Sequence, residues 1–378
     1  MNLKMQITAL VGWIFQAALL GAVNITYTIN TETGRTAISP YIYGSNFDHV
    51  ACENLTVRRM GGNRTTGYNW ENNFSNAGSD WYHSSDRYMS GYLPGSQQLI
   101  PGKVYYDFHQ DNLNAGRDTI LTLQMAGYVA DDDAQTVAEA QTAPSYRWKE
   151  VVYKKPAPFC IPAGSPNTSD NYVYMDELVN YLVFAFGNAS TSSGVLFYAL
   201  DNEPALWSST HPRIHPNPVG CAELINRSSA LSSAVKDVDP YALITGPALY
   251  GFTAFLNLQN APDWNAVKGS YQWFIDYYLA KMKTEGQTAG KRLLDVLDVH
   301  WYPEAQDDNG VRITQFASTN TNYTARMQAP RTLWDNGYFE KSWIGDWFKS
   351  YLPLLPKLTS SINTHYPETK LAITEYDY

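Results

Sequence analysis

The chain has 378 residues, of which 44% are hydrophobic, so it can bury a sizeable core and is not disordered by composition. Its net charge of −9, with no basic stripe, argues against nucleic acid and anionic membrane surfaces as partners, and we expect a neutral polymer instead. Aromatic residues make up 14% of the chain, which suits stacking against flat, weakly charged ligands, although any single aromatic is as readily a core residue.

The first predicted element, residues 1–22, has the pattern of a secretory signal peptide. Lys4 supplies the positive charge, residues 11–20 are apolar, and Leu20-Gly21-Ala22 forms a small-residue cleavage site. The apolar run is short for a membrane anchor, which is the alternative interpretation. We therefore expect a secreted, extracellular protein that has no membrane segment after cleavage.

Residues 23–37 alternate apolar and polar side chains around Glu32-Thr33-Gly34, a pattern typical of a β-hairpin. The pattern changes at residue 38. We interpret residues 23–37 as strands of an accessory β-sandwich and residues 38–378 as a separate catalytic unit.

In this second unit, short apolar runs alternate with longer helical patterns. The predicted strands, several of them apolar almost throughout as strands buried on both faces should be, are 40–47, 55–60, 119–125, 195–200, 242–245, 293–300 and 371–374. The predicted helices are 175–186, 221–238, 271–285 and 343–358. Strands separated by helices imply right-handed βαβ units, so we predict an α/β fold of the (β/α)₈ barrel type.

The predicted barrel is one strand short. The chain ends at Tyr378, three residues after Glu375, and we expect the last barrel strand to be missing at this C-terminus. The long polar linkers 63–95 and 131–170 follow the second and third predicted strands. The loops after barrel strands build the active site, so both linkers are expected to be functional.

Two predicted strands deliver a glutamate to their C-terminal ends. Glu203 follows the apolar run 196–200 and precedes Pro204, which ends the strand. Glu375 follows the apolar run 371–374 in the same way. These are the fourth and seventh strands, so the two carboxyl groups should face each other across the barrel mouth. A turn with surface acids is the alternative reading of the first motif.

A facing pair of carboxyl groups suits glycoside hydrolysis. Retaining enzymes place the two groups about 5–5.5 Å apart, so that one attacks the anomeric carbon while the other serves as acid and then as base. We predict Glu375 as the nucleophile and Glu203 as the acid/base, whose pKa must be raised in the free enzyme. Glu304, a third glutamate near a strand end, is the alternative nucleophile.

Longer polar and aromatic motifs accompany these glutamates. They are RMGGNR at 59–64, YNWENN at 68–73, SNAGSDW at 75–81, DNEPALW at 201–207, THPR at 210–213 and ITEY at 373–376. Over roughly residues 38–378 the chain resembles glycoside hydrolase family 44, although Asp377 stands where we expect Asn in that family. The resemblance implies a barrel plus a β-sandwich built from both chain ends. It also implies a retaining mechanism with endoglucanase and xyloglucanase activity.

Several side chains near the two glutamates are expected to bind substrate. Arg59 and Asn63 flank the Gly61-Gly62 pair, whose backbone can approach a ligand closely, and they can reach the nucleophile or the sugar. An arginine at a barrel mouth is often only an ion-pair partner. Asn202 can donate a hydrogen bond to a sugar hydroxyl.

The ring-bearing candidates for substrate contact are chosen by their positions in the predicted barrel. His300, Trp301 and Tyr302 end the sixth predicted strand, and His300 is either a contact of the nucleophile or a satisfied core histidine. Trp70, Trp301 and Trp334 are predicted to stack on sugar faces, with the core as the alternative for about half of such tryptophans.

We therefore predict a monomeric, cofactor-free glycoside hydrolase that cuts internal β-1,4 bonds in cellulose-type glucans, in xyloglucan, or in both. The alternatives are a two-glutamate barrel enzyme acting on mannan or xylan, and a carbohydrate-binding protein without catalysis. Asp131-Asp132-Asp133 matches no EF-hand spacing, so no metal is predicted. Cys52, Cys160 and Cys221 allow at most one disulfide, whose partners the spacing does not identify.

Overall fold

In the computed structural model of the chain, the described residues are 26, 28, 30–35, 37–46, 54–315 and 319–378. The predicted signal peptide lies outside them. Within the predicted hairpin, the described residues 30–35 contain bends and no strand, and much of the remainder lies outside the described part, so the accessory strands stay a prediction. The chain divides into two compact units, residues 1–40 and 41–378, and the second carries the site.

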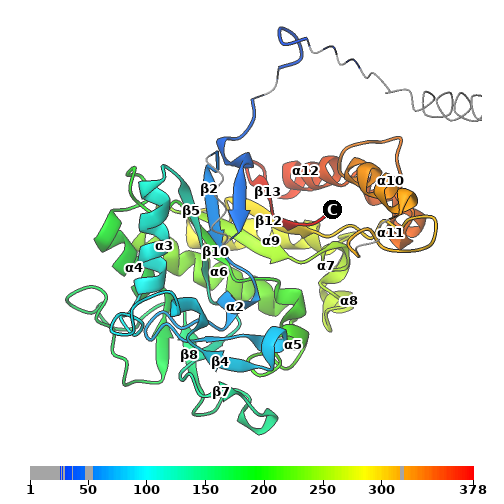
Figure 1. Cartoon of the computed structure of the whole chain (residues 1–378). Coiled ribbons are helices and arrows are strands. Elements are labelled where there is room, and N and C mark those ends of the chain that lie inside the picture. The colour runs from blue at the N-terminus through cyan, green and yellow to red at the C-terminus, as the bar shows by residue number, and fades with distance from the viewer. Residues whose placement is uncertain (1–25, 27, 29, 36, 47–53, 316–318) are drawn as a thin grey trace, which may run out of the picture. The chain divides into compact units, whose positions relative to one another are not determined.

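The second unit is built on a seven-stranded sheet in which every neighbouring pair of strands is parallel (Figure 1). The strand order follows the chain: β1 (Gly44–Asn46), β2 (Val57–Met60), β5 (Asp118–Leu123), β10 (Phe197–Leu200), β11 (Leu243–Leu249), β12 (Val296–Trp301) and β13 (Lys370–Tyr376). Each predicted strand overlaps one of these. Every residue of β2, β10 and β12 is buried, as expected for strands covered on both faces.

The two outer strands of this sheet approach each other. The side-chain amide of Asn46, at the end of β1, donates a hydrogen bond of 2.7 Å to the main-chain carbonyl of Thr374 in β13. The sheet is therefore curved into a nearly closed barrel, which confirms the predicted fold class. The carboxyl ends of all seven strands meet at one mouth, where barrels carry their sites.

Helices connect the strands and cover the outside of the sheet. The longest are α3 (Lys103–Asn114), α4 (Met175–Phe186), α6 (Cys221–Val238), α9 (Phe274–Ala289) and α12 (Leu354–His365). The predicted helices 175–186 and 221–238 coincide with α4 and α6. Shorter helical elements are α2 (Asn63–Thr66), α5 (Trp207–Thr210), α7 (Phe252–Asn257), α8 (Trp264–Val267), α10 (Asn320–Gln328), η1 (Pro40–Ile42), η2 (Gly78–Trp81), η3 (Tyr88–Ser90), η4 (Glu139–Gln141), η5 (Pro204–Leu206) and η6 (Ala329–Leu333).

The predicted single helix over 343–358 is wrong. The segment forms α11 (Trp343–Trp347), then η7 (Lys349–Tyr351), and only then α12. Pro353 has no N–H to donate and disfavours the helical conformation in the residue before it. Leu352 is accordingly extended, with φ −109° and ψ 149°, so the helix cannot continue through this point.

The two long linkers, together with a few residues on either side of the second, form two small sheets that the sequence patterns did not predict. One has the order β3 (Ser75–Asn76), β4 (Ser84–Asp86) and β7 (Gln135–Thr136), and the other β6 (Tyr128–Ala130), β8 (Trp148–Val152) and β9 (Tyr172–Tyr174). Both are inserted after β2 and β5, so each linker has an ordered framework beside the barrel mouth (Figure 1).

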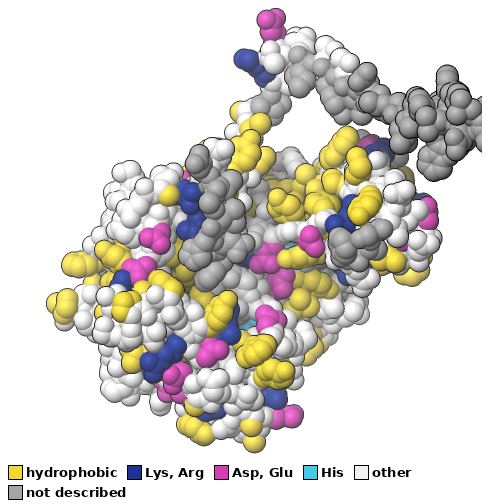
Figure 2. All heavy atoms as spheres, viewed as in Figure 1, with side chains coloured by type: hydrophobic (Ala, Val, Ile, Leu, Met, Phe, Trp, Pro, Cys, Tyr) yellow, Lys and Arg dark blue, Asp and Glu magenta, His cyan; other side chains and the backbone are white. Residues whose placement is uncertain are grey.

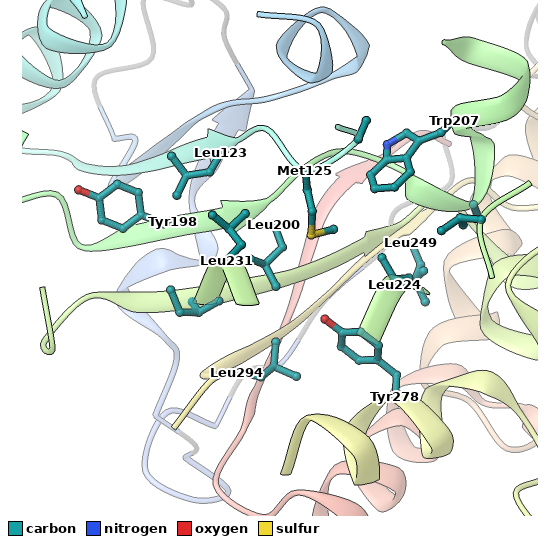
Figure 3. Packing of buried hydrophobic residues seen from close by; sticks show 14 of the residues in the cluster. Leu123, Met125, Tyr198, Leu200, Trp207, Leu224, Leu231, Leu249, Tyr278 and Leu294 are labelled. Carbon is teal, nitrogen blue, oxygen red and sulfur yellow. The ribbon is translucent and has the colours of Figure 1, made fainter. Parts of the chain in front are cut away.

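The core lies between the barrel sheet and its surrounding helices. Leu200 of β10 and Leu249 of β11 pack with Leu224 and Leu231 of α6 and with Tyr278 of α9, all fully buried (Figure 3). Burying a side chain of this size contributes about 1.5–3 kcal/mol relative to leaving it exposed. This packing makes the ends of the strands a rigid base for the polar groups that follow them.

Among the residues that the structure describes, no helix combines the length and the apolar character needed to cross a bilayer. Cys160 and Cys221 are both free thiols, and Cys52 lies outside the described residues.

Candidate active site

A strained turn places Glu203 at the barrel mouth. Strand β10 ends at Leu200, and both Asp201 (φ 58°) and Glu203 (φ 45°) then take left-handed backbone conformations, which non-glycine residues seldom adopt. The backbone N–H of Glu203 donates to the carbonyl of Ala248 in β11 at 3.0 Å. Such conformations persist only where the surroundings hold them, and they cluster at functional sites.

The buried Asp201 carboxylate holds this turn. Its Oδ1 accepts hydrogen bonds from the hydroxyl of Thr66 at 2.6 Å and from the N–H of Asn202 at 2.7 Å. Its Oδ2 accepts from the backbone N–H groups of Met125 and Ala126 at 2.5 and 3.0 Å. Burial raises the pKa of Asp201, and these hydrogen bonds oppose that rise. Hydrogen bonds thus tie the turn that carries Glu203 to α2, which follows β2, and to the residues that follow β5.

The structure brings Glu203 and Glu375 together with His300 between them. The Nδ1 atom of His300 lies 2.8 Å from an oxygen of Glu203 and 3.6 Å from an oxygen of Glu375. One carboxylate oxygen from each glutamate and a ring nitrogen of His300 all lie within 4.8 Å of one another. The histidine is fully buried, whereas 13% and 17% of the two glutamate side chains remain exposed, so a ligand can reach both carboxyl groups.

Two further side chains hold Glu375. Arg59 donates to Oε1 at 2.6 Å, and the Tyr302 hydroxyl donates to Oε2 at 3.0 Å. Burial alone would raise the pKa of Glu375, but the electrostatic effects of His300 and Arg59 and these two hydrogen bonds lower it overall. Burial and the neighbouring Glu375 carboxylate raise the pKa of Tyr302, so its hydroxyl stays protonated as a donor. Glu375 is therefore held as an ionised carboxylate.

A chain of hydrogen bonds extends from Arg59 toward the first linker. Arg59 also donates to the side-chain oxygen of Asn202 at 2.8 Å, and the Asn202 amide donates to Asn63 at 3.2 Å. Asn63 in turn donates to both carboxylate oxygens of Asp80, at 3.1 and 3.2 Å. Arg59, Asn63 and Asn202 are thus connected to Glu375 by hydrogen bonds, and their contacts with substrate stay a prediction. In the space-filling view, acidic side chains and a histidine are visible together near the middle of the face shown (Figure 2).

The same cluster has the composition of a metal site, since Glu203, His300 and Glu375 each offer one ligand atom. Its geometry suits acid–base chemistry better. The guanidinium of Arg59 occupies one side of Glu375 at 2.6 Å and would repel a cation placed there. In the acidic run at 131–133, Asp132 and Asp133 form ion pairs with Arg147 and Arg87.

Glu304, the alternative nucleophile, is not part of the cluster. Its carboxylate pairs with Arg312 at 2.6 Å, on the segment that follows β12. The partner that the structure places beside Glu203 is therefore Glu375.

Two of the predicted stacking tryptophans belong to the core. Trp70 and Trp301 have no exposed surface, so neither can present a ring face to a sugar. Trp70 donates its indole N–H to the carbonyl of Tyr174 at 3.2 Å. Because side chains alternate along a strand, Trp301 and His300 point to opposite faces of β12, and only His300 reaches the site.

Trp334 is exposed, with 62% of its surface accessible. It follows η6 and lines a shallow groove together with residues on one face of α12, namely Leu355, Pro356, Thr359, Ser360, Asn363 and Thr364. None of these residues belongs to the glutamate cluster, so the structure does not bring Trp334 together with the other predicted site residues. The stacking of Trp334 on a sugar face therefore stays a prediction.

Several residues that hold the site were not among those predicted from the sequence. Asn46 accepts a hydrogen bond from Arg59 at 3.1 Å, and Asp80 anchors Asn63. Asp298 is fully buried in β12 beneath the cluster and accepts a hydrogen bond from the Thr374 hydroxyl at 2.7 Å. The otherwise apolar run 293–300 contains two carboxyl groups, Asp295 and Asp298, and this pattern could have drawn attention to both, because an acid is seldom buried without a role.

Comparison with known proteins is consistent with this geometry. The sequence profile of glycoside hydrolase family 44 matches residues 74–305. The chain is 57% identical over 360 residues to Endoglucanase A of Paenibacillus lautus and 52% identical over 369 residues to the Beta-mannanase/endoglucanase A of Caldicellulosiruptor saccharolyticus. Each match covers 94% of this chain but only 51% and 27% of those proteins, respectively.

A solved structure is similar in fold as well as in sequence. The family 44 xyloglucanase of Paenibacillus polymyxa, solved with xyloglucan, superposes with a TM-score of 0.88 at 56% identity. The match covers 91% of this chain and 67% of that one.

Proposed function

The chain belongs to glycoside hydrolase family 44, and from this membership and the geometry of the site we propose that it hydrolyses internal β-1,4-glucosidic bonds with retention of configuration. The proposed substrates are cellulose-type glucans, xyloglucan, or both. The observation that carries the proposal is the glutamate pair, in which one oxygen of Glu203 lies within 4.8 Å of one oxygen of Glu375. Retaining glycosidases have carboxyl groups about 5–5.5 Å apart, and inverting ones about 6.5–9.5 Å.

In the first step, Glu375 attacks the anomeric carbon while Glu203 gives its proton to the leaving glycosidic oxygen. The C–O bond to the leaving chain breaks as the bond to the Glu375 carboxylate forms, giving a covalent glycosyl-enzyme. The lowered pKa of Glu375 supports its role, because it favours the ionised form that attacks.

In the second step, water hydrolyses the glycosyl-enzyme with Glu203 acting as the base. The Glu203 carboxylate removes a proton from water, the water oxygen attacks the anomeric carbon, and the bond to Glu375 breaks. His300 lies within 3.6 Å of both carboxyl groups, so its ring nitrogen can interact with either of them. A carbohydrate-binding protein without catalysis would need no such pair.

The choice of substrate rests on the surface chemistry and on the relatives. The net charge of −9 disfavours anionic polymers, and β-glucans are neutral. Related proteins are named an endoglucanase and a xyloglucanase, which favours these substrates for this chain. The name of a further relative includes β-mannanase, so mannan is the second candidate substrate. We also propose that the protein is secreted, on the strength of the signal-like residues 1–22, and that it acts as a monomer.

The experiment that tests this function is hydrolysis of carboxymethyl cellulose, xyloglucan, xylan and mannan by the purified protein. We expect viscosity to fall faster than reducing ends accumulate, because internal bonds are cut, with the highest rates on one of the two glucans. Proton NMR of the first product from a cello-oligosaccharide should show the β-anomer before mutarotation. An α-anomer as first product would contradict retention. Hydrolysis restricted to mannan would make mannan the substrate in place of the glucans.

Replacing Trp334 and Trp301 by alanine, one at a time, should distinguish a tryptophan that stacks on sugar from one that packs in the core. Trp334→Ala should raise KM on long glucans about fivefold, since one stacking contact is worth on the order of 1 kcal/mol, and should leave the melting temperature nearly unchanged. Trp301→Ala should instead cost about 3–5 kcal/mol of folding stability, because it opens a cavity in the core. Steady-state kinetics and thermal unfolding of both variants make the comparison. An unchanged KM for Trp334→Ala would remove that residue from the binding surface.

A further inference from the structure

Strand β13 carries one residue more than its partner just before the proposed nucleophile. Along β12 and β13 the pairing is regular as far as Val299 with Ile373. It then resumes with His300 opposite Glu375, so Thr374 is the extra residue of a β-bulge. Bulges bend a strand and re-aim its side chains, and they are frequent next to active sites.

This extra residue decides which face Glu375 occupies. In an unbroken register Glu375 would pair with Trp301 and share its face, where the indole is fully buried. With Thr374 inserted, Glu375 comes into register with His300, 3.6 Å from its ring. Asp298 and His300 are two residues apart in β12, so their side chains lie on the same face of that strand. Thr374 contacts the first and Glu375 the second, so both side chains lie on this face.

Side chains hold the bulge from two sides. The hydroxyl of Thr374 donates to Oδ1 of Asp298 at 2.7 Å, and its main-chain carbonyl accepts the amide of Asn46 at 2.7 Å. Asn46 in turn accepts a hydrogen bond from Arg59, which binds Glu375. The Oδ2 atom of Asp298 is buried and has no hydrogen-bond partner in the described part of the chain. Burying a carboxyl group with so few partners is costly, which marks Asp298 as more than core packing.

We infer that Asp298 and Thr374 are positioning residues that hold the bulge and thereby aim Glu375 at the anomeric carbon. The inference rests on the proposed role of Glu375 as nucleophile. Neither residue belongs to the cluster of Glu203, His300 and Glu375. Their hydrogen bond fixes the backbone from which the nucleophile projects, so its loss should slow attack on the anomeric carbon without weakening substrate binding.

The test compares Thr374→Val, which keeps the shape and removes the hydroxyl, with Thr374→Ser, which keeps the hydroxyl. Two rates are measured: kcat on xyloglucan, and covalent trapping by 2,4-dinitrophenyl 2-deoxy-2-fluoro-β-cellobioside. In trapping, the Glu375 carboxylate bonds to the anomeric carbon and dinitrophenolate leaves. We expect Thr374→Val to lower both rates about 10- to 100-fold, as a displacement of about 1 Å does, with KM nearly unchanged. Thr374→Ser should stay within about threefold of the unmodified protein.

Thr245→Val is the matched control. Thr245 is a buried threonine of the neighbouring strand β11, and its hydroxyl has no hydrogen-bond partner among the described residues, so its loss should change neither rate. In the double variant Asp298→Ala/Thr374→Val, trapping should be no slower than in the slower single variant, because both changes break one hydrogen bond. If Thr374→Val does not fold, Thr374→Ala removes the same hydroxyl and takes its place.

The possible results separate the inference from the proposed function. Trapping of Thr374→Val at the unmodified rate would overturn the inference and leave the function standing. Losses that simply add in the double variant would also overturn it, since the two residues would then act independently. If the unmodified protein is not trapped and hydrolyses no glucan, the proposed function itself fails, and the inference fails with it.

Discussion

Replacing Glu375 by glutamine is expected to abolish hydrolysis of every glycoside, with a loss in kcat on the order of 10⁴-fold or more. The amide keeps the shape of the side chain but cannot form the covalent intermediate, and no other carboxyl group of the cluster faces Glu203. Because departure of the leaving group depends on the same attack, even activated dinitrophenyl glycosides should remain intact. The measurement is kcat on xyloglucan and on dinitrophenyl cellobioside.

Glu304→Gln is the matched control for this substitution. Glu304 is also a glutamate near a strand end, but it pairs with Arg312 away from the cluster, so its amide variant should hydrolyse both substrates at nearly the unmodified rate. Thermal unfolding of both variants would check that each remains folded. A dead Glu304→Gln beside an active Glu375→Gln would transfer the nucleophile to Glu304.

Replacing Glu203 by glutamine should affect substrates according to their leaving groups. On glucans, whose leaving oxygen needs a proton, we expect a loss of about 10²–10⁴-fold, the usual contribution of general acid–base catalysis. On dinitrophenyl cellobioside the first step needs no proton and should stay fast. Without a base to activate water, the glycosyl-enzyme should then accumulate, visible as a burst of dinitrophenolate followed by slow turnover.

Azide should restore turnover of Glu203→Gln. It is a nucleophile that needs no base, so it can attack the trapped glycosyl-enzyme and release a β-glycosyl azide. The control is the unmodified protein, whose rate azide should not raise. If azide rescued Glu375→Gln with retention of configuration and left Glu203→Gln inactive, the two roles would be reversed.

The positions of the two glutamates could be predicted because a buried parallel strand leaves a strong local pattern. Strands covered on both faces are apolar almost throughout, so the polar residue that follows such a run stands at the barrel mouth. Glu203 after β10 shows this pattern, as does His300 in β12. Glu375 follows a similar apolar run, Leu371-Ala372-Ile373, although the residues of β13 are only partly buried or exposed. The helices α4 and α6 could be predicted with correct ends for a similar reason, since their apolar periodicity is continuous.

The break in the predicted helix 343–358 could also have been predicted from the sequence, but from a proline and not from the apolar pattern. Pro353 interrupts the segment, and a proline inside a helical pattern ends the helix at or before the preceding residue. The small sheets had no comparable signal, because every strand in them except β8 has only two or three residues, too few to show a period.

What the sequence determined by itself was the class of fold, the order of the strands and the carboxyl groups at their ends. Only the tertiary structure decided which of two adjacent residues, His300 or Trp301, faces the site, and that Thr374 bulges so that Glu375 faces it too. These outcomes depend on the register between strands that are distant in the chain. A shift of one residue in that register moves every later side chain to the other face, and nothing within either segment records it.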